Sequence, residues 1–263
     1  MCLLVVCSGV VRGFPLVVAA NRDERLDRPA VAITVLRDAE PRILGGRDEL
    51  AGGTWLAVND RGVVAGLTNR PSSAGRDPSR RSRGELPLIL AGEASVDEAI
   101  AAFSAKVDPS AYNAAWLLVG DRRALTYIEI DGEGAPRYQN LPAGIHILEN
   151  RPLDVASGKV DRAREVLGDP SSLSAELLVD RLTAVLSDHE IAPDPLVATP
   201  TGAASRARPA CVHGDGYGTR SATIVLVPDE GQSVILVADG RPCSNPFTDQ
   251  SWRWSPASTS AET

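Results

Sequence analysis

The residue best suited to catalysis is Cys2, which becomes the first residue of the chain once Met1 is removed. An amino-terminal cysteine supplies a thiol nucleophile and, through its own α-amine with a pKa of about 8, a general base. No histidine partner is then required. The alternative is an ordinary buried thiol in front of an apolar strand, and Cys2 taken by itself favours that alternative.

Four consecutive polar residues follow the second apolar segment of the chain: Asn21, Arg22, Asp23 and Glu24. Beside a catalytic cysteine, such side chains could orient the amine, hold the thiolate and bind a substrate carboxylate. A solvated turn explains the same run equally well.

Three further residues could take part in catalysis or binding. Asn69 and Asn150 each end a predicted strand, where a side-chain amide can donate a hydrogen bond to a developing oxyanion, although asparagine is also a common turn residue. Arg220 ends a glycine-rich segment and offers a bidentate guanidinium. A tight loop before a strand is the alternative for that segment.

The sequence predicts no metal ligands. The cysteines contain no CxxC pair, and the histidines are far apart without ligand spacing, so neither a zinc site nor a disulfide framework is expected. A reducing cytoplasmic location fits this cysteine usage best. The residues concerned are Cys2, Cys7, Cys211 and Cys243, and His146, His189 and His213.

The elements that must position Cys2 are two short apolar runs, residues 3–8 and 14–20, which predict a β-hairpin. A turn near Arg12 and Gly13 would bring residues whose numbers sum to about 25 opposite one another. Cys2 should then face Asp23, within a register error of a couple of residues.

The rest of the chain predicts strands and helices in blocks. Residues 54–58 and 63–69 suggest a second hairpin, and Ser95 with Glu98 forms a capping box for a helix. This order favours sheets covered by helices on both outer faces. The other expected helices are residues 85–91, 155–167 and 174–187, and the other expected strands are 114–119, 124–130, 146–148, 221–227 and 233–238.

Composition limits the classes of function. The 263 residues suggest a single domain over 1–254 with a disordered tail over 255–263, and the formal net charge of −7 disfavours nucleic acid as a partner. No apolar run approaches the roughly 20 residues that span a bilayer, so no membrane span is expected.

Taken together, several short motifs resemble the NRDE family, also called the transport and Golgi organisation protein 2 family. The resemblance runs from residue 2 to about residue 228, and the combination is far more specific than any one motif. The motifs are Met1-Cys2, Asn21-Arg22-Asp23-Glu24, Gly53-Thr54-Trp55, Gly66-Leu67-Thr68-Asn69-Arg70, Ser82-Arg83-Gly84 and Tyr217-Gly218-Thr219-Arg220-Ser221.

That family is similar to the amino-terminal nucleophile hydrolases, which implies an α+β fold of four layers, αββα, with two mostly antiparallel sheets. The resemblance also implies roles. Cys2 would be the nucleophile, Arg22 and Asp23 the flanking pair, and Asn69 and Asn150 the oxyanion or positioning groups. The residues expected to contact the substrate are Asn21, Glu24, Trp55, Arg70 and Arg220. Because the hydrolases usually read Arg-Asn-x-Asp here, either Asp23 or Glu24 could be the site acid.

Two functions follow from the resemblance. The first is hydrolysis of a linear amide through a thioester on Cys2, with no cofactor required and a small molecule bearing an acyl or carboxylate group as substrate. The second is non-catalytic binding of haem or acyl-coenzyme A in the same pocket, with Arg22 and Arg220 holding propionates or phosphates.

Overall fold

The computed structural model describes residues 3–72, 75–194 and 208–255, so Met1, Cys2 and all but the first residue of the expected tail lie outside the described residues. The strands are β1 (Leu3–Val11), β2 (Phe14–Arg25), β3 (Ala30–Arg37), β4 (Ile43–Asp48), β5 (Leu56–Asn59), β6 (Val64–Asn69), β7 (Ala115–Gly120), β8 (Leu125–Ile130), β9 (Arg137–Asn140), β10 (Gly144–Leu148), β11 (Tyr217–Val227), β12 (Val234–Asp239) and β13 (Thr248–Asp249). The α-helices are α1 (Leu86–Leu90), α2 (Val96–Lys106), α3 (Gly158–Leu167) and α4 (Ala175–Ser187).

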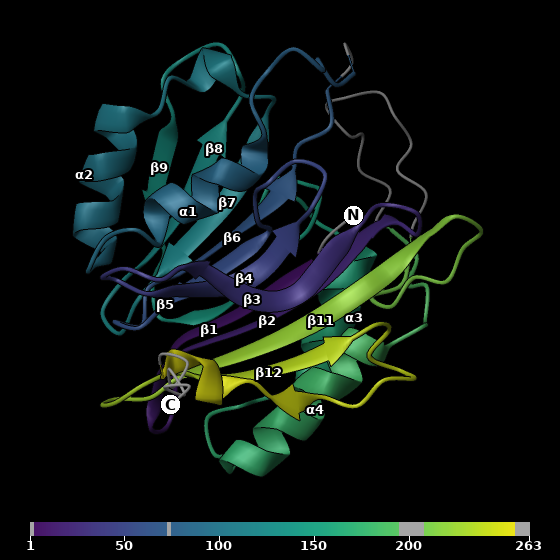
Figure 1. The fold of residues 1–263 in the computed structure, drawn as a ribbon. Coiled ribbons are helices and arrows are strands. Elements are labelled where there is room, and N and C mark those ends of the chain that lie inside the picture. The colour runs from purple at the N-terminus through teal and green to yellow at the C-terminus, as the bar shows by residue number, and fades with distance from the viewer. Residues whose placement is uncertain (1–2, 73–74, 195–207, 256–263) are drawn as a thin grey trace, which may run out of the picture.

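The strands form two antiparallel sheets that lie against each other. One sheet has the order β10-β1-β2-β11-β12-β13, and the other has the order β3-β4-β5-β6-β7-β8-β9. Helices α1 and α2 lie on the outer side of the second sheet, and α3 and α4 lie on the outer side of the first (Figure 1).

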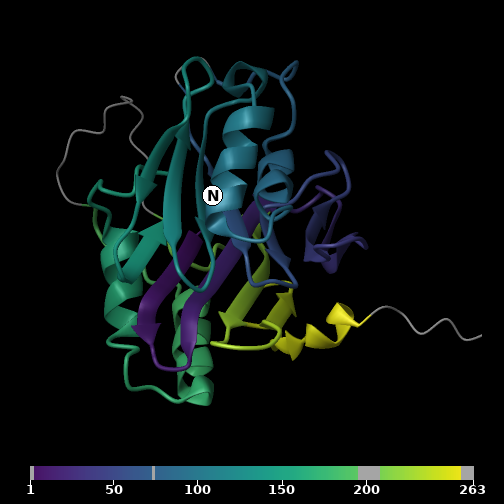
Figure 2. The same cartoon turned by 90° about the vertical axis from the view of Figure 1, so that its left-hand side faces the viewer.

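Three hydrophobic cores hold the four layers together. The first core lies between the sheets and includes Leu4, Leu16 and Leu118. The second joins the β1–β2–β11 side to α3 and α4, and the third joins β5–β8 to α1 and α2. Alternate residues of each strand enter opposite cores, because successive side chains point to opposite faces of a sheet. The rotated view shows the two helical layers at opposite sides of the sheets (Figure 2). The predicted αββα architecture is therefore confirmed.

The first hairpin has nearly the predicted register. Leu3 pairs with Asn21 and Leu4 with Ala20, so the numbers of each pair sum to 24 as far as Ser8, beyond which a bulge shifts the register. The expectation that β2 ends before the polar run is wrong. Strand β2 continues to Arg25 because β11 pairs along its other edge as far as Tyr217.

Most predicted helices and strands are present with shifted ends. Ser95 caps α2, its side chain accepting from Glu98 N, as the capping box predicts. Strands β3, β4, β9 and β13 have no counterpart in the sequence prediction. In β4 the reason is Gly45-Gly46, which is typical of a turn. A side chain at Gly46 would overlap the Trp55 ring, since its Cβ would lie 2.0 Å from Cζ2.

Among the residues that the structure describes, no helix has both the length and the apolar character needed to cross a bilayer.

Candidate functional site

A pocket of about 320 Å³ opens where the final residues of β2, β4 and β6 meet. Charged and polar side chains dominate its lining, with Trp55 as the largest apolar surface. The lining residues are Arg22, Asp23, Glu24, Arg25, Arg28, Asp48, Ala51, Gly53, Thr54, Trp55, Leu67, Asn69, Arg76, Ser82, Arg83 and Gly84. The pocket therefore brings Asn69 together with three residues of the polar run of β2, Arg22, Asp23 and Glu24, which are 45 or more positions away in the sequence.

Asp23 is the buried acid of this pocket, with 4% of its surface exposed. The Thr219 hydroxyl donates to Asp23 Oδ1 at 2.6 Å and accepts from Val212 N at 2.9 Å. Burial raises the pKa of Asp23, against the lowering effects of the Lys159 charge and the Thr219 hydrogen bond. Asp23 therefore holds a proton more readily than an exposed aspartate does.

Arg22 is buried against an aromatic ring. Its guanidinium carbon lies 4.4 Å from the centre of the Trp55 ring, and its Nη2 lies 3.7 Å from Asp48 Oδ2. Cation–π stacking and the carboxylate together offset the cost of burying this charge. Trp55, which immediately precedes β5, thus supports Arg22 and also lines the pocket.

Glu24 differs from Asp23 in its surroundings. It is partly exposed, and its Oε2 lies 3.8 Å from Arg28 Nε, whose main partner is Asp48 at 2.7 Å. Asp23 and Glu24 both line the pocket, but of the two only Asp23 is buried.

Arg220 belongs to β11, and its side chain contacts the turn after β2. It is not among the lining residues of the pocket. Its Nη1 donates to three carbonyl oxygens of that turn: Arg25 O at 3.1 Å, Leu26 O at 2.5 Å and Arg28 O at 3.2 Å. Such a three-carbonyl contact orders the main chain that carries Glu24 and Arg28.

The structure brings Asn69 and Asn150 together. Asn150 Nδ2 donates to Asn69 O at 2.6 Å, and the neighbouring Thr68 hydroxyl donates to Glu149 O at 2.9 Å. The end of β6 is therefore tied to the segment after β10. Of the two asparagines, Asn69 lines the pocket, and Asn150 holds the main chain of Asn69 in place.

Two of the motifs make one wall of the pocket. A Cβ on Gly53 would lie 2.5 Å from the Gly84 carbonyl carbon, and Thr54 N donates to Gly84 O at 2.9 Å. The two glycines allow the main chains of the Gly53-Thr54-Trp55 and Ser82-Arg83-Gly84 segments to approach this closely.

Besides Arg220, two other residues predicted to contact the substrate, Asn21 and Arg70, lie away from the pocket lining. Asn21 is fully buried, and its Nδ2 donates to Leu186 O at 2.8 Å and Ala210 O at 2.9 Å. Arg70 stacks over Trp116 at 5.8 Å and lies 3.7 Å from Glu129 Oε2.

The sequence reasoning missed Lys159, a buried residue in the first turn of α3 with 7% of its surface exposed. Its charge favours the ionised form of Asp23. Within the described residues its Nζ makes no hydrogen bond. Only the pattern Ser157-Gly158-Lys159 at a helix start could have drawn notice to it, and a lysine there is ordinarily solvated.

The expectation that the histidines and cysteines do not group is wrong. His189, Cys211, His213 and Cys243 each place one potential ligand atom within 4.8 Å of the others. The sequence hid this cluster because tertiary folding joins three separate segments.

Solved structures with this arrangement of layers include hydrolases. The chain is similar to a mutant of the conjugated bile acid hydrolase from Clostridium perfringens, with a TM-score of 0.53 and 10% identity over 95% of this chain and 96% of that one. It is also similar to the Caenorhabditis elegans ortholog of N-acylethanolamine-hydrolyzing acid amidase, with a TM-score of 0.50 and 14% identity over 86% of this chain and 94% of that one. These similarities define an amino-terminal nucleophile hydrolase-like fold, and at such identities they establish the fold alone.

The sequence gives a closer assignment. Residues 1–237 match the family described as Transport and Golgi organisation 2, and the chain belongs to that family. Its relatives include the Transport and Golgi organization protein 2 homologs of Bos taurus, 31% identical, and Homo sapiens, 30% identical. Each alignment covers 83% of this chain and 84% of the relative.

Proposed function

We propose that the chain is an amidohydrolase that cleaves a linear carbon–nitrogen bond with Cys2 as its nucleophile. The observation that carries the proposal is the buried, hydrogen-bonded Asp23 beside Arg22 at the end of β2. Leu3, which follows Cys2 in the sequence, pairs with Asn21 of β2, the strand that also carries Arg22 and Asp23. Both structural neighbours are named as hydrolases, and one as an amidase, which supports the same reaction class.

The proposed reaction has two halves. The Cys2 thiol gives its proton to the free α-amine, and the sulfur attacks the amide carbon while the carbonyl electrons move to oxygen. The Asn69 amide stabilises this oxyanion. The carbon–nitrogen bond then breaks, and the α-ammonium gives its proton to the leaving amine. Water next attacks the thioester, transfers a proton to the amine and releases the carboxylic acid with the thiol restored.

The lining of the pocket favours a substrate with a negative charge. Five arginines line the pocket against three acids, and Asp48 already pairs with Arg28 and Arg22. Arg76 is exposed at the pocket rim. Guanidinium groups bind carboxylates in a planar, bidentate manner, so an acyl group that ends in a carboxylate suits this pocket.

Intact mass and turnover test the proposal. The purified chain should lack Met1, and it should release nitroaniline from glutaryl-p-nitroanilide, a linear amide with one carboxylate. Cys2→Ala should lower that release by about 1,000-fold or more while the fold is retained, as checked by circular dichroism. A mature chain that keeps Met1 would contradict the proposal, because the general base would be locked in a peptide bond.

A matched pair of asparagine variants tests the oxyanion role. Asn69→Ala should lower kcat by about 100- to 1,000-fold, the usual cost of removing one oxyanion donor. Asn140→Ala, on the exposed strand β9, serves as the control and should leave kcat unchanged. Equal activity of both variants would remove Asn69 from the mechanism.

The arginine-rich lining also favours a second candidate, binding of an anionic ligand such as acyl-coenzyme A without chemistry. Haem suits the pocket less well, because the described lining residues include no histidine or methionine and few apolar side chains. Calorimetric titration with acyl-coenzyme A and with haem separates the candidates. Tight binding that survives Cys2→Ala, with no acyl adduct on the wild-type chain, would favour the second candidate.

A further inference from the structure

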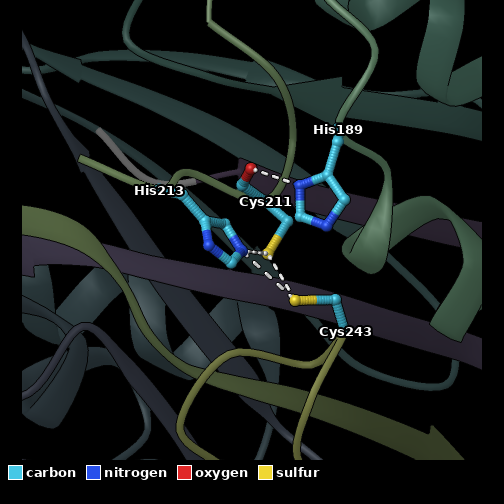
Figure 3. A group of neighbouring side chains, drawn as sticks. All are labelled: His189, Cys211, His213 and Cys243. Atoms are coloured by element: carbon cyan, nitrogen blue, oxygen red, sulfur yellow. Dashed lines mark hydrogen bonds between the residues drawn. The ribbon is translucent and has the colours of Figure 1, made fainter.

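Two histidines and two cysteines converge beside the first sheet, away from the residues that line the pocket. His189 follows α4, Cys211 and His213 precede β11, and Cys243 follows β12. Their side chains point toward one another from these three segments (Figure 3). Imidazole nitrogen and thiolate sulfur in this two-and-two combination are the ligands of structural zinc sites.

The distances within the cluster match a tetrahedral metal site. With zinc–sulfur bonds of about 2.3 Å and zinc–nitrogen bonds of about 2.0–2.1 Å, a regular tetrahedron has sulfur–sulfur edges of about 3.8 Å and sulfur–nitrogen edges of about 3.6 Å. In the structure Cys211 Sγ lies 3.7 Å from Cys243 Sγ and 3.7 Å from His213 Nε2. His213 Nε2 lies 3.3 Å from Cys243 Sγ. These three atoms already form one face of such a tetrahedron.

His189 is placed to complete the set. Its ring lies 4.7 Å from the His213 ring, centre to centre, and its ligand atom is within 4.8 Å of the other three. A shift of about 1 Å would bring it to bonding geometry for a metal held by the other three. Its Nδ1 lies 3.2 Å from Cys211 O, and a hydrogen bond donated there leaves Nε2 with the free lone pair.

A disulfide accounts for less of the geometry. The two sulfurs are well beyond the S–S bond length of about 2.05 Å, and a disulfide would leave both histidines without a role. Three of the four side chains are exposed, so an ion can reach the cluster from solvent.

We propose that His189, Cys211, His213 and Cys243 form a tetrahedral zinc site. All four ligands come from protein, which makes the site closed and structural. The zinc ion joins the end of α4 to the segments on both sides of the β11–β12 hairpin. The proposal does not depend on the amidohydrolase chemistry of Cys2.

The zinc site would also support the pocket through one short path. Cys211 is followed by Val212, whose N–H donates to the Thr219 hydroxyl that in turn donates to Asp23. Ala210, on the other side of Cys211, accepts from the buried Asn21 amide. A metal bound to Cys211 would therefore also hold in place the main chain of Ala210 and Val212, which contacts Asn21 and, through Thr219, Asp23.

Metal content and an optical probe test the site. The full chain, purified in reductant with zinc in the medium, should hold about one zinc ion after dialysis, as measured by mass spectrometry of the metal. Replacement of zinc by Co²⁺ should produce a thiolate-to-cobalt charge-transfer band and the intense visible bands of a tetrahedral complex. Octahedral cobalt bands, or no bound metal under reducing conditions, would overturn the proposal.

Variants assign the ligands. Cys243→Ser lies on an exposed loop, so the fold should survive, and His213→Asn is also at an exposed position. Each substitution should weaken zinc binding by more than about 10-fold. Loss of a residue that only supports a metal ligand already costs about 10-fold, and loss of a ligand should cost more. Cys2→Ala, Cys7→Ala and His146→Asn are matched controls and should retain zinc. Equal zinc retention by Cys243→Ser and the controls would show a site elsewhere, and a Cys211–Cys243 disulfide in reductant would rule out the zinc site.

Discussion

At the residue scale, Asp23 joins the chemistry of the pocket to the stability of the fold. Its carboxyl group is buried, and one oxygen accepts a hydrogen bond from Thr219. Burial disfavours the charged form more than the neighbouring Lys159 charge and this hydrogen bond favour it, so the net effect is a raised pKa. A protonated or readily protonated acid beside Arg22 is suited to a site in which protons move between a thiol and an amine.

The raised pKa predicts a pH dependence of stability. The folded chain binds the Asp23 proton more tightly than the unfolded chain, so the free energy of unfolding should fall as the pH rises from the ordinary value of 3.8 through the raised pKa. Asp23→Asn removes this titration. The free energy of unfolding of Asp23→Asn minus that of the wild type, measured with urea at a series of pH values, should therefore increase as the pH rises across this window.

Asp27 provides a control of opposite sign in a lower pH window. Its hydrogen bond with Arg25 lowers its pKa, so Asp27→Asn should lose stability relative to the wild type as the pH rises from that lowered pKa to the ordinary value of 3.8, and the difference should stay constant above it. Parallel pH profiles for Asp23→Asn and the wild type would contradict the assignment of a raised pKa to Asp23.

At the element scale, the fit between β4 and the segment before β5 determines where Arg22 lies. Gly46 on β4 lies under the Trp55 indole, and that indole in turn supports the Arg22 guanidinium at 4.4 Å. Glycine at position 46 is required by close approach, because any Cβ there would overlap the ring.

Gly46→Ala should therefore displace the Trp55 ring and the arginine stacked on it. We expect a loss of about 1–3 kcal/mol in the free energy of unfolding, the usual cost of overpacking, together with a changed tryptophan fluorescence. Gly134→Ala is the matched control, since the nearest atom to its Cβ, Asp131 Oδ2, lies at 4.0 Å. Unchanged stability and fluorescence in Gly46→Ala would show that the indole does not occupy this position.

At the scale of the whole molecule, three separate cores must form for the four layers to associate. The proposed zinc site lies at the edge of the second core and links α4 to the chain around β11 and β12. An ion bound only by the folded chain shifts the folding equilibrium by mass action.

The melting temperature should consequently rise with free zinc concentration. At a free concentration 100-fold above Kd, the stabilisation amounts to about 2.7 kcal/mol. Differential scanning calorimetry with zinc and with chelator measures it, and Cys243→Ser should show no such rise. A chelator-insensitive melting temperature in the wild type would contradict a structural role for the cluster.

Local patterns predicted much of the fold because they depend on neighbouring residues. The turn expected near Arg12 and Gly13 predicted the register of β1 and β2 to within one position, and Ser95 marked the start of α2 through a cap that spans three residues. The motif combination indicated the family and placed Arg22, Asp23 and Asn69 among the candidate site residues, all of which line the pocket.

Tertiary structure alone decided what depends on residues distant in the chain. Pairing with β11 extends β2 through its polar run, a contact some 195 positions apart that no local pattern encodes. Separation along the sequence also hid the effect of Lys159 on Asp23 and the convergence of His189, Cys211, His213 and Cys243. The sequence by itself determined the side chains and their local conformations. Which of them meet was set by the packing of two sheets and two helical layers, because burial of apolar surface between layers joins segments without regard to their spacing along the chain.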